Sequence, residues 1–248
     1  MPASIGATLG ATVAALTDLV LPSDCAGGGT AALGATAGIC PDCAAELARL
    51  VPYETAPTPT PYGLPVCVAL GPYDGVLREL VLAYKDRGRH RLARPLAVQL
   101  ARGVAACAVR LGHPPGSPVV VIPVPSTAAA ARQRHGDHMR RLARETVRTL
   151  NGLGWPAAMS SVAAARPRAD SAHLSAADRA VAARDAFRTR LTPARRVAAA
   201  AAVGASVIAV DDVLTTGATL ASLATRLTSD GVAVRGAVTL AATRRRTA

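Results

Sequence analysis

Val207–Leu220 has the sequence VIAVDDVLTTGATL, in which a short apolar run ends in two adjacent carboxylates. Four unbroken apolar residues before Asp211 predict a strand that is buried on both faces, as in a parallel sheet. The Thr/Gly segment that follows predicts a loop, and the alanine- and leucine-containing pattern after it predicts a helix. Two acids and a Thr-rich loop are therefore expected between a buried strand and the start of a helix.

The start of that helix suits an anion, because unpaired N–H groups and the positive end of the helix dipole meet there. Thr215, Thr216 and Thr219 add hydroxyl donors, and Gly217 lets the backbone approach closely. Two acids beside a phosphate loop suit a ligand that also carries hydroxyls, such as a ribose 5-phosphate. The alternative is a strand end with a Thr-rich helix cap, because Thr and Asp both favour N-caps.

The composition is that of a globular protein. The chain has 248 residues, of which 50% are hydrophobic, 18% charged and 2% aromatic, so Ala, Val and Leu must build the core of one or two domains. The net charge of +12 suits phosphate-rich ligands such as pyrophosphate or nucleic acid. An Arg- and Ala-rich composition also arises from genomic base bias, so charge alone does not identify a partner.

The N-terminal segment does not have the pattern of a leader peptide. No Lys or Arg precedes Arg49, so the basic start of a signal peptide is missing. Apolar residues between Ile5 and Val20 recur at spacings of three and four, which predicts an amphipathic helix that packs on its own protein. No apolar run is long enough to predict a transmembrane helix. We therefore expect a cytoplasmic protein without membrane insertion.

Five cysteines in a cytoplasmic chain are expected to be metal ligands or core residues rather than disulfides. Cys40 and Cys43 form a Cys-x-x-Cys pair, whose two thiolates can face one tetrahedral zinc ion. Cys25 has Gly28 where a second such pair would have its other cysteine, so the predicted zinc knuckle is degenerate. Two interpretations stay open: a zinc site with a fourth ligand from elsewhere, or a knuckle that packing alone holds together.

The other two cysteines have different predicted roles. Cys67 is the unassigned candidate for a fourth zinc ligand, whereas Cys107 falls in a helical pattern and is expected in the core. A redox role for the Cys-x-x-Cys pair is discounted, because no thioredoxin-like strand and helix surround it.

The chain divides into three predicted regions. Residues 1–50 hold the N-terminal helix and the degenerate knuckle, and residues 51–65 form a Pro-rich linker. Residues 66–248 alternate apolar runs with helical stretches, which predicts an α/β fold with a mainly parallel sheet flanked by helices. The predicted strands are Val66–Leu70, Val119–Ile122, about Val162–Ala165, Val207–Val210 and Val234–Leu240. The predicted helices are 75–87, 89–110, 137–150 and 218–230, and the Ala stretch 198–202 is compatible with helix or loop.

Several motifs together resemble a known family. The Asp-Asp and Thr-Thr-Gly-x-Thr segment closely resembles the motif with which type I phosphoribosyltransferases bind 5-phosphoribosyl-1-diphosphate (PRPP). It follows, in order, the knuckle, YDGVLREL from Tyr73, YKDRG from Tyr84 and IPVPS from Ile122. In this order the segments resemble the ComF/GntX family of phosphoribosyltransferase-domain proteins along nearly the whole chain. The resemblance implies a type I phosphoribosyltransferase fold for residues 66–248.

The resemblance also implies a site for PRPP as its magnesium complex. Asp211 and Asp212 are the implied catalytic residues, which hold the ribose beside the positive charge that develops on it. The residues implied to bind the 5-phosphate are Thr215, Thr216, Gly217, Ala218 and Thr219. Those implied to bind pyrophosphate are Pro125, Ser126 and Lys85. The alternative for Lys85 is a surface charge at a helix end, where Gly88 is the predicted C-cap.

Two segments depart from the family pattern. Residues 166–188 resemble the mobile hood that closes over substrate, and they keep Arg179 but lack two amide side chains that the family usually has there. An RGFN-like block is replaced by RHGDH at residues 134–138. His135, His138 and His173 are interpreted as exposed loop histidines rather than as a metal cluster.

Two functions follow from these motifs. The first is a PRPP-dependent glycosyltransferase of unknown acceptor, which works by positioning and charge stabilisation. The second is a non-catalytic PRPP-sensing or DNA-binding protein, since the family is associated with DNA uptake and competence; single-stranded DNA and competence proteins are its expected partners. One Trp and one Phe provide few stacking platforms, so any DNA contact is expected to be electrostatic. The missing hood amides favour the second function.

Overall fold

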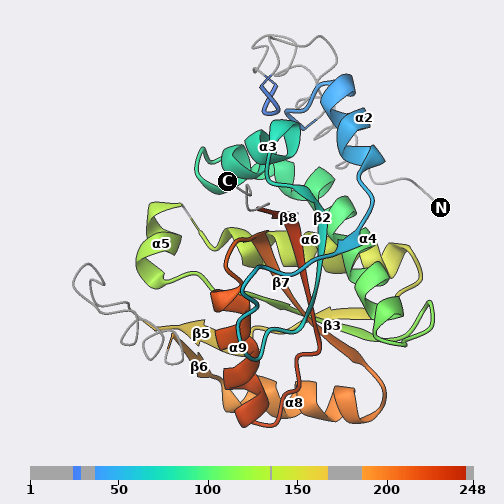
Figure 1. The fold of residues 1–248 in the computed structure, drawn as a ribbon, viewed down its shortest axis with the longest axis vertical. Helices are drawn as coiled ribbons and strands as arrows, with labels where there is room; N and C mark the ends of the chain where they lie inside the picture. Colours follow the sequence, from blue (N-terminus) through green and yellow to red (C-terminus); the bar gives the residue numbers. More distant parts are fainter. Residues whose placement is uncertain (1–24, 29–36, 135, 167–185, 244–248) are drawn as a thin grey trace, which may run out of the picture.

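The computed structural model describes residues 25–28, 37–134, 136–166 and 186–243. Within these ranges the protein has an α/β fold, in which helices flank a six-stranded, mostly parallel sheet (Figure 1). A separate two-stranded sheet lies beside it. The predicted α/β class with a mainly parallel sheet is confirmed.

The main sheet contains one antiparallel edge strand and five parallel strands. Their bounds are Tyr53–Glu54 (β1), Val66–Pro72 (β2), Val119–Pro123 (β3), Ala157–Met159 (β4), Ser206–Leu214 (β7) and Gly236–Ala242 (β8). They lie in the order β1-β2-β8-β7-β3-β4, and only β1 runs antiparallel to its neighbour. The separate antiparallel pair consists of Ala163–Ala165 (β5) and Phe187–Thr189 (β6).

Helices cover both faces of the main sheet (Figure 1). Their bounds are Pro41–Arg49 (α2), Gly75–Lys85 (α3), Ala93–Arg110 (α4), Ala128–Gln133 (α5), His138–Gly152 (α6), Leu191–Ala202 (α8) and Ala218–Ser229 (α9). On one face α3, α4 and α6 share a core with Ile208 and Val210 of β7. On the other face α8 and α9 share a second core with Val207 and Ala209. Successive β7 residues thus enter opposite cores, as the two-residue repeat of a strand requires.

Four of the five predicted strands are confirmed as β2, β3, β7 and β8. All five residues of β3 and the first five of β7 are buried, which confirms the predicted double burial. The fifth predicted strand, about 162–165, was wrongly assigned to the parallel sheet: β5 pairs only with β6. The edge position belongs to β4, whose sequence AAM lacks the β-branched residues that mark a strand.

The predicted helices are confirmed with shifted ends. The segment 89–110 begins with a 3-10 turn at His90–Leu92 before α4, and the Ala stretch belongs to α8. The prediction of Gly88 as the C-cap is wrong, because α3 already ends at Lys85 with Asp86 as its cap. Gly88 acts further out: its φ of 67° turns the chain so that the Arg89 N–H donates to the Ala83 carbonyl at 3.1 Å. The predicted N-terminal amphipathic helix lies outside the described residues.

Part of the Pro-rich segment 51–65 belongs to the sheet. β1 pairs with β2, and the Thr55 N–H donates to the Cys67 carbonyl at 2.9 Å. Pro57 and Leu64 lie next to Gly217, where a Cβ atom would approach each of them to 3.1 Å. The segment therefore packs against the loop between β7 and α9.

One helical span among the described residues, His90–Arg110, is long and apolar enough to cross a membrane by length and composition alone. Within its most apolar stretch, 61% is buried inside the protein. This burial comes from packing on β2, β8 and α6.

The connections that follow β3 and β7 diverge. These strands are neighbours in the sheet, but β3 leads to α6 on one face and β7 leads to α9 on the other. Where neighbouring connections leave toward opposite faces, their loops part at the carboxyl ends of the strands and open a crevice for ligands.

Candidate functional site

A pocket of about 690 Å³ lies at these carboxyl ends, between the loop after β3 and the loop after β7. Seven of the residues predicted for the PRPP site line it: Lys85, Pro125, Ser126, Asp211, Asp212, Thr215 and Thr219. They come from α3, β7, the two loops and the first turn of α9, so the fold gathers segments that are far apart in the sequence. Thr216 and Gly217 of the loop after β7, and Ala218 at the start of α9, are not among the lining residues.

The two carboxylates line the same pocket but have different surroundings. β7 continues through both of them to Leu214. Asp212 points toward α3 and α6, and its side chain is 8% exposed. Asp211 is half-buried, and its Oδ1 accepts the Asp212 N–H. The sequence predicts that both acids lie at the end of the strand, whereas the strand extends past them.

Asp212 is fully engaged by neighbouring groups. Its Oδ2 lies 2.7 Å from Lys85 Nζ and 3.1 Å from His138 Nε2, and its Oδ1 accepts the Val213 N–H at 2.8 Å. Burial alone raises the pKa of Asp212, but the hydrogen bond from His138 and the charge of Lys85 outweigh burial and lower the pKa to about 2. Asp212 is therefore a carboxylate at neutral pH.

Asp211 has the opposite electrostatic character. Burial and the adjacent charge of Asp212 raise its pKa to about 8, although the Asp212 N–H donates to its Oδ1 at 2.9 Å. Two adjacent carboxyl groups thus have pKa values on opposite sides of neutrality. At neutral pH the pair can offer one carboxylate, which accepts hydrogen bonds, and one carboxyl group, which can also donate.

The loop after β7 opens α9 toward the pocket. Gly217 is the N-cap residue, with a left-handed φ of 72° that an L side chain rarely adopts. Thr215 and Thr216 are exposed, and Thr219 in the first turn of α9 is half-buried. The hydroxyls of Thr215 and Thr219 and the positive end of the α9 dipole therefore face the place where an anion would bind, while the Ala218 N–H donates to Thr216 Oγ1 at 3.4 Å.

The loop after β3 forms the facing wall. Its first residue, Val124, is buried and donates its N–H to the Val210 carbonyl of β7 at 2.9 Å. Thr127 ends the loop as the N-cap of α5, where its hydroxyl accepts the Ala130 N–H at 3.2 Å. Pro125 and Ser126 are thus fixed between two anchored ends.

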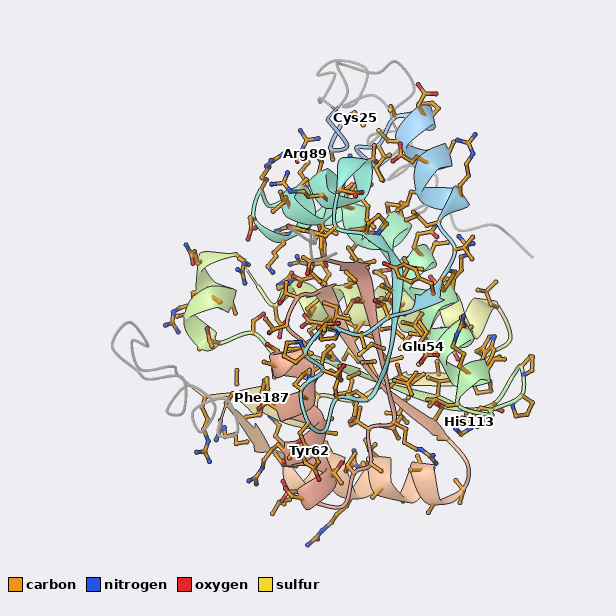
Figure 2. The ribbon with its side chains drawn as sticks, viewed as in Figure 1. Cys25, Glu54, Tyr62, Arg89, His113 and Phe187 are labelled. Atoms are coloured by element: carbon orange, nitrogen blue, oxygen red, sulfur yellow. The ribbon has the colours of Figure 1, made fainter. Side chains whose placement is uncertain are left out.

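The predicted hood begins and ends at the pocket. Ala165 just before it, Arg166 at its start, and Ala186 and Phe187 near its end line the cavity, and the Arg166 N–H donates to the Ala186 carbonyl at 2.9 Å. Figure 2 labels Phe187 at this wall. Arg179 lies within 167–185, outside the described residues.

His138 is the functional candidate that the sequence missed. The prediction of an exposed loop histidine is wrong: His138 is the first residue of α6, is 4% exposed and contacts Asp212. The available signal was Asp137 before it, a strong N-cap residue that predicts the helix start. His135 and His173 lie outside the described residues.

Arg132 and Arg134 also line the pocket, and Nε of Arg134 lies 3.2 Å from Asp86 Oδ1 at the end of α3. With Lys85 they give this wall a positive charge, which suits a phosphate-rich ligand.

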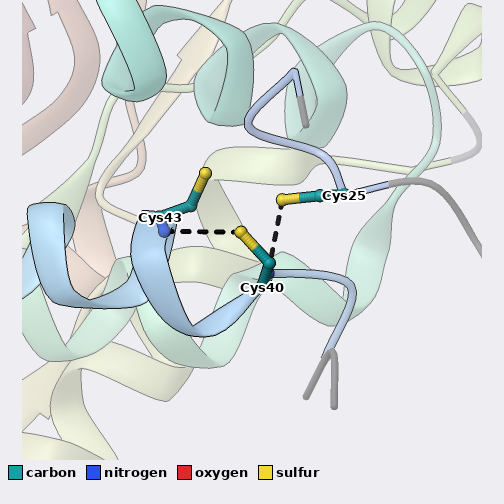
Figure 3. Close-up of side chains that lie close together, drawn as sticks. All are labelled: Cys25, Cys40 and Cys43. Carbon is teal, nitrogen blue, oxygen red and sulfur yellow. Dashed lines mark hydrogen bonds between the residues drawn. The ribbon is translucent and has the colours of Figure 1, made fainter. Parts of the chain in front are cut away.

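The three cysteines of the predicted knuckle form a second candidate site (Figure 3). The Sγ atoms of Cys25, Cys40 and Cys43 all lie within 4.8 Å of one another and are buried, so they could hold a metal ion. The Cys25 sulfur accepts the Cys40 N–H at 3.3 Å and the Gly27 N–H at 3.4 Å. In Figure 2 Cys25 lies far from Phe187, so this cluster is separate from the pocket.

The electrostatics of the cluster favour one thiolate. Burial raises the pKa of the Cys25 thiol, but the N–H groups of Cys40 and Gly27 and the neighbouring thiols together lower it to about 7. Burial and the hydrogen bonds of Cys40 and Cys25 raise the pKa of Cys43 to about 12. A metal ion would stabilise all three thiolates.

The remaining cysteines take no part in this cluster. Cys67 lies in β2 within the core beneath α8 and α9, so it is not the fourth ligand that the sequence suggested. Cys107 is fully buried in α4, which confirms its predicted place in the core.

Comparisons with models of known protein families and with curated proteins give no match to this chain. The interpretation of the site therefore depends on its geometry and chemistry.

Proposed function

We propose that the protein binds PRPP in this pocket and is a ComF-like protein with the type I phosphoribosyltransferase fold. The observation that carries the proposal is the convergence of an acid pair, a Thr-rich helix N-terminus and a cationic wall on one pocket at the carboxyl ends of β3 and β7. PRPP carries ribose hydroxyls between two phosphorylated ends, so each of these three features has a matching part of the ligand. The N-terminus of α9 would take the 5-phosphate, and Asp211 and Asp212 would take the ribose hydroxyls.

The diphosphate would lie between Lys85 and the loop that contains Pro125 and Ser126. It is expected to arrive as a magnesium complex, in which the cation neutralises part of its charge. In turnover, a nitrogen of the acceptor would form a bond to C1 of the ribose while the bond from C1 to pyrophosphate breaks. Positive charge develops on the ribose in this step, and the carboxylate of Asp212 would stabilise it. The wall made by Arg166 and Phe187 would face the acceptor.

The first test is calorimetric titration with PRPP and magnesium. The wild type is expected to bind, and the double variant Asp211→Asn/Asp212→Asn is expected not to bind. Thr219→Val should weaken binding, whereas Thr228→Val, at an exposed position of the same helix, should not. Absence of binding by the folded wild type would exclude the proposal. Where binding is found, pyrophosphate release with a panel of bases distinguishes a transferase from a PRPP sensor.

The thiol cluster supports a second, structural role. We propose that Cys25, Cys40 and Cys43 bind zinc and hold the segment before α2 against α3. Three thiolates close together match the chemistry of zinc, and the buried cluster belongs to the same core as α3 and α4. Metal content of the purified protein, measured with and without a chelator, tests this role.

A further inference from the structure

Two side chains hold one oxygen of Asp212, and they differ in mobility. Lys85 is the last residue of α3, and its side chain is 28% exposed at the pocket. The side chain of His138 is 5% exposed. A lysine ammonium on a flexible stem can move to another anion, whereas a buried ring cannot.

The backbone around His138 is anchored from two directions. Asp137 caps α6 by accepting the Arg140 N–H at 3.0 Å. The hydroxyl of Tyr84, which is buried in α3, donates to the His138 carbonyl at 2.7 Å. The ring is therefore fixed at the junction of α3, α6 and β7.

The His138 ring directs Nε2 to Asp212 and leaves its other nitrogen, Nδ1, without a hydrogen bond in the described part of the chain. Because Oδ2 belongs to a carboxylate, Nε2 must carry the hydrogen of this contact. Nδ1 is buried and has no hydrogen-bond partner among the described residues. A buried nitrogen without a partner costs free energy, so the fold tolerates this cost where the Nε2 contact offsets it.

We infer that His138 is a positioning residue, which keeps Asp212 in place when Lys85 transfers from Asp212 to the diphosphate of the ligand. This inference rests on the proposed function. A bound diphosphate would compete with Oδ2 for the Lys85 ammonium, so ligand binding would weaken the 2.7 Å ion pair. His138 then remains as the side-chain donor to Oδ2, and Asp212 keeps its orientation toward the ribose.

The binding test uses two replacements of His138 with different chemistry. Leucine removes the N–H donor, whereas glutamine keeps an amide N–H near the position of Nε2. Calorimetry with PRPP and magnesium should show affinity at least about tenfold weaker for His138→Leu, which is about 1.4 kcal/mol. His138→Gln should bind within about threefold of the wild type.

A structural control separates positioning from general loosening of α6. Thr146→Val alters a fully buried hydroxyl of the same helix, which donates to the Leu142 carbonyl at 3.0 Å and does not contact Asp212. It is expected to lower the thermal midpoint while leaving PRPP affinity unchanged. Wild-type affinity in His138→Leu, or equal weakening in Thr146→Val, would overturn the positioning role.

A second measurement does not depend on PRPP. Titration of the Asp212 carboxyl group, followed by carbon NMR, should give a higher pKa in His138→Leu than in the wild type, and a much smaller change in His138→Gln. Lys85→Met should also raise it. Failure of the wild type to bind PRPP would overturn the proposed function, whereas an unchanged Asp212 titration in His138→Leu would overturn the role of His138.

Discussion

Lys85 Nζ lies 2.7 Å from Asp212 Oδ2, which joins the C-terminal end of α3 to β7 at the floor of the pocket. The carboxylate is nearly buried and the ammonium is partly exposed, so the pair is less screened than a surface ion pair. In the proposed complex the same lysine that stabilises Asp212 also binds the diphosphate, so this contact would connect stability and binding.

Lys85→Met should therefore affect both properties. Removal of the ammonium leaves the Asp212 carboxylate with His138 and the Val213 N–H, and we expect a loss of about 1–2 kcal/mol in the free energy of unfolding near neutral pH. Arg87→Met is the matched control, since Arg87 pairs with Glu79 on the exposed side of the same helix end and should cost less than about 0.5 kcal/mol. Urea unfolding measures both, and equal losses would contradict the special role of Lys85.

The two acids should respond differently to replacement by asparagine. Asp212→Asn removes the carboxylate that accepts from Lys85 and His138, so it should destabilise the fold by about 1–3 kcal/mol near pH 7. Asp211→Asn resembles the protonated form that its raised pKa already favours, so it should cost much less. Thermal and urea unfolding of the two single variants test this contrast, and a larger loss for Asp211→Asn would contradict the pKa assignment.

The pH dependence of stability should reflect Asp211. With a pKa of about 8, folded Asp211 keeps its proton in a range where the unfolded chain, with a pKa near 3.8, has lost it. The folded state then binds more protons, so stability falls as pH rises from about 4 to about 8. The pKa of Asp212 is lowered to about 2, so its contribution is lost only in stronger acid.

Asp211→Asn should remove most of this decline. The free energy of unfolding of the wild type should fall by about 1–3 kcal/mol more than that of the variant between about pH 5 and pH 8. Urea unfolding at several pH values provides the measurement. Parallel curves for the two proteins would show that Asp211 titrates normally in the folded state.

The sequence predicted the local features of the site well. Apolar runs identified β3 and β7, and the residues immediately after them line the pocket because parallel strands end at the same edge of a sheet. What the sequence could not provide is the pairing across the fold. The sequence predicts a helix over 137–150 but not the burial of its first turn, and only the packing of α6 on β7 brings the His138 ring to Asp212.

The different surroundings of Asp211 and Asp212 were also beyond the sequence. An Asp-Asp pair after four apolar residues marks the end of a strand by composition, but ladder pairing with β8 continues to Leu214. Lys85 and His138 contact Asp212 rather than Asp211, and the pKa values of the two acids therefore diverge. Short strands without β-branched residues, such as β4, lacked any local signal.

Gly217 should be intolerant of a side chain for two separate reasons. Its φ is 72°, and a Cβ atom would lie 3.1 Å from both Leu64 Cδ1 and Pro57 Cγ. Gly231 has a similar φ of 81°, but a Cβ atom there would meet nothing within 4 Å, so Gly231→Ala carries the backbone strain alone. We expect about 1–2 kcal/mol for Gly231→Ala and about 1 kcal/mol more for Gly217→Ala.

Binding provides a second readout for the same pair. Gly217→Ala should also weaken PRPP binding, because the glycine shapes the loop at the start of α9, whereas Gly231→Ala should leave affinity unchanged. Equal unfolding energies and equal affinities in the two variants would mean that the Pro-rich segment does not constrain this loop.

Gly28→Cys should strengthen metal binding at the thiol cluster. It completes a second Cys-x-x-Cys pair, and the nearest atom to a Cβ at this position is Glu79 Cγ at 3.9 Å, so the side chain has room. The φ of 95° adds backbone strain of about 1–2 kcal/mol, which is small beside the binding energy of a structural zinc ion. Cobalt(II) absorption reports the number of thiolate ligands, and its charge-transfer intensity should rise in Gly28→Cys and fall in Cys43→Ser. Cys67→Ala, in a different core, should leave the spectrum unchanged. A folded wild type and a folded Gly28→Cys protein that both fail to retain metal would instead establish a knuckle stabilised by packing alone.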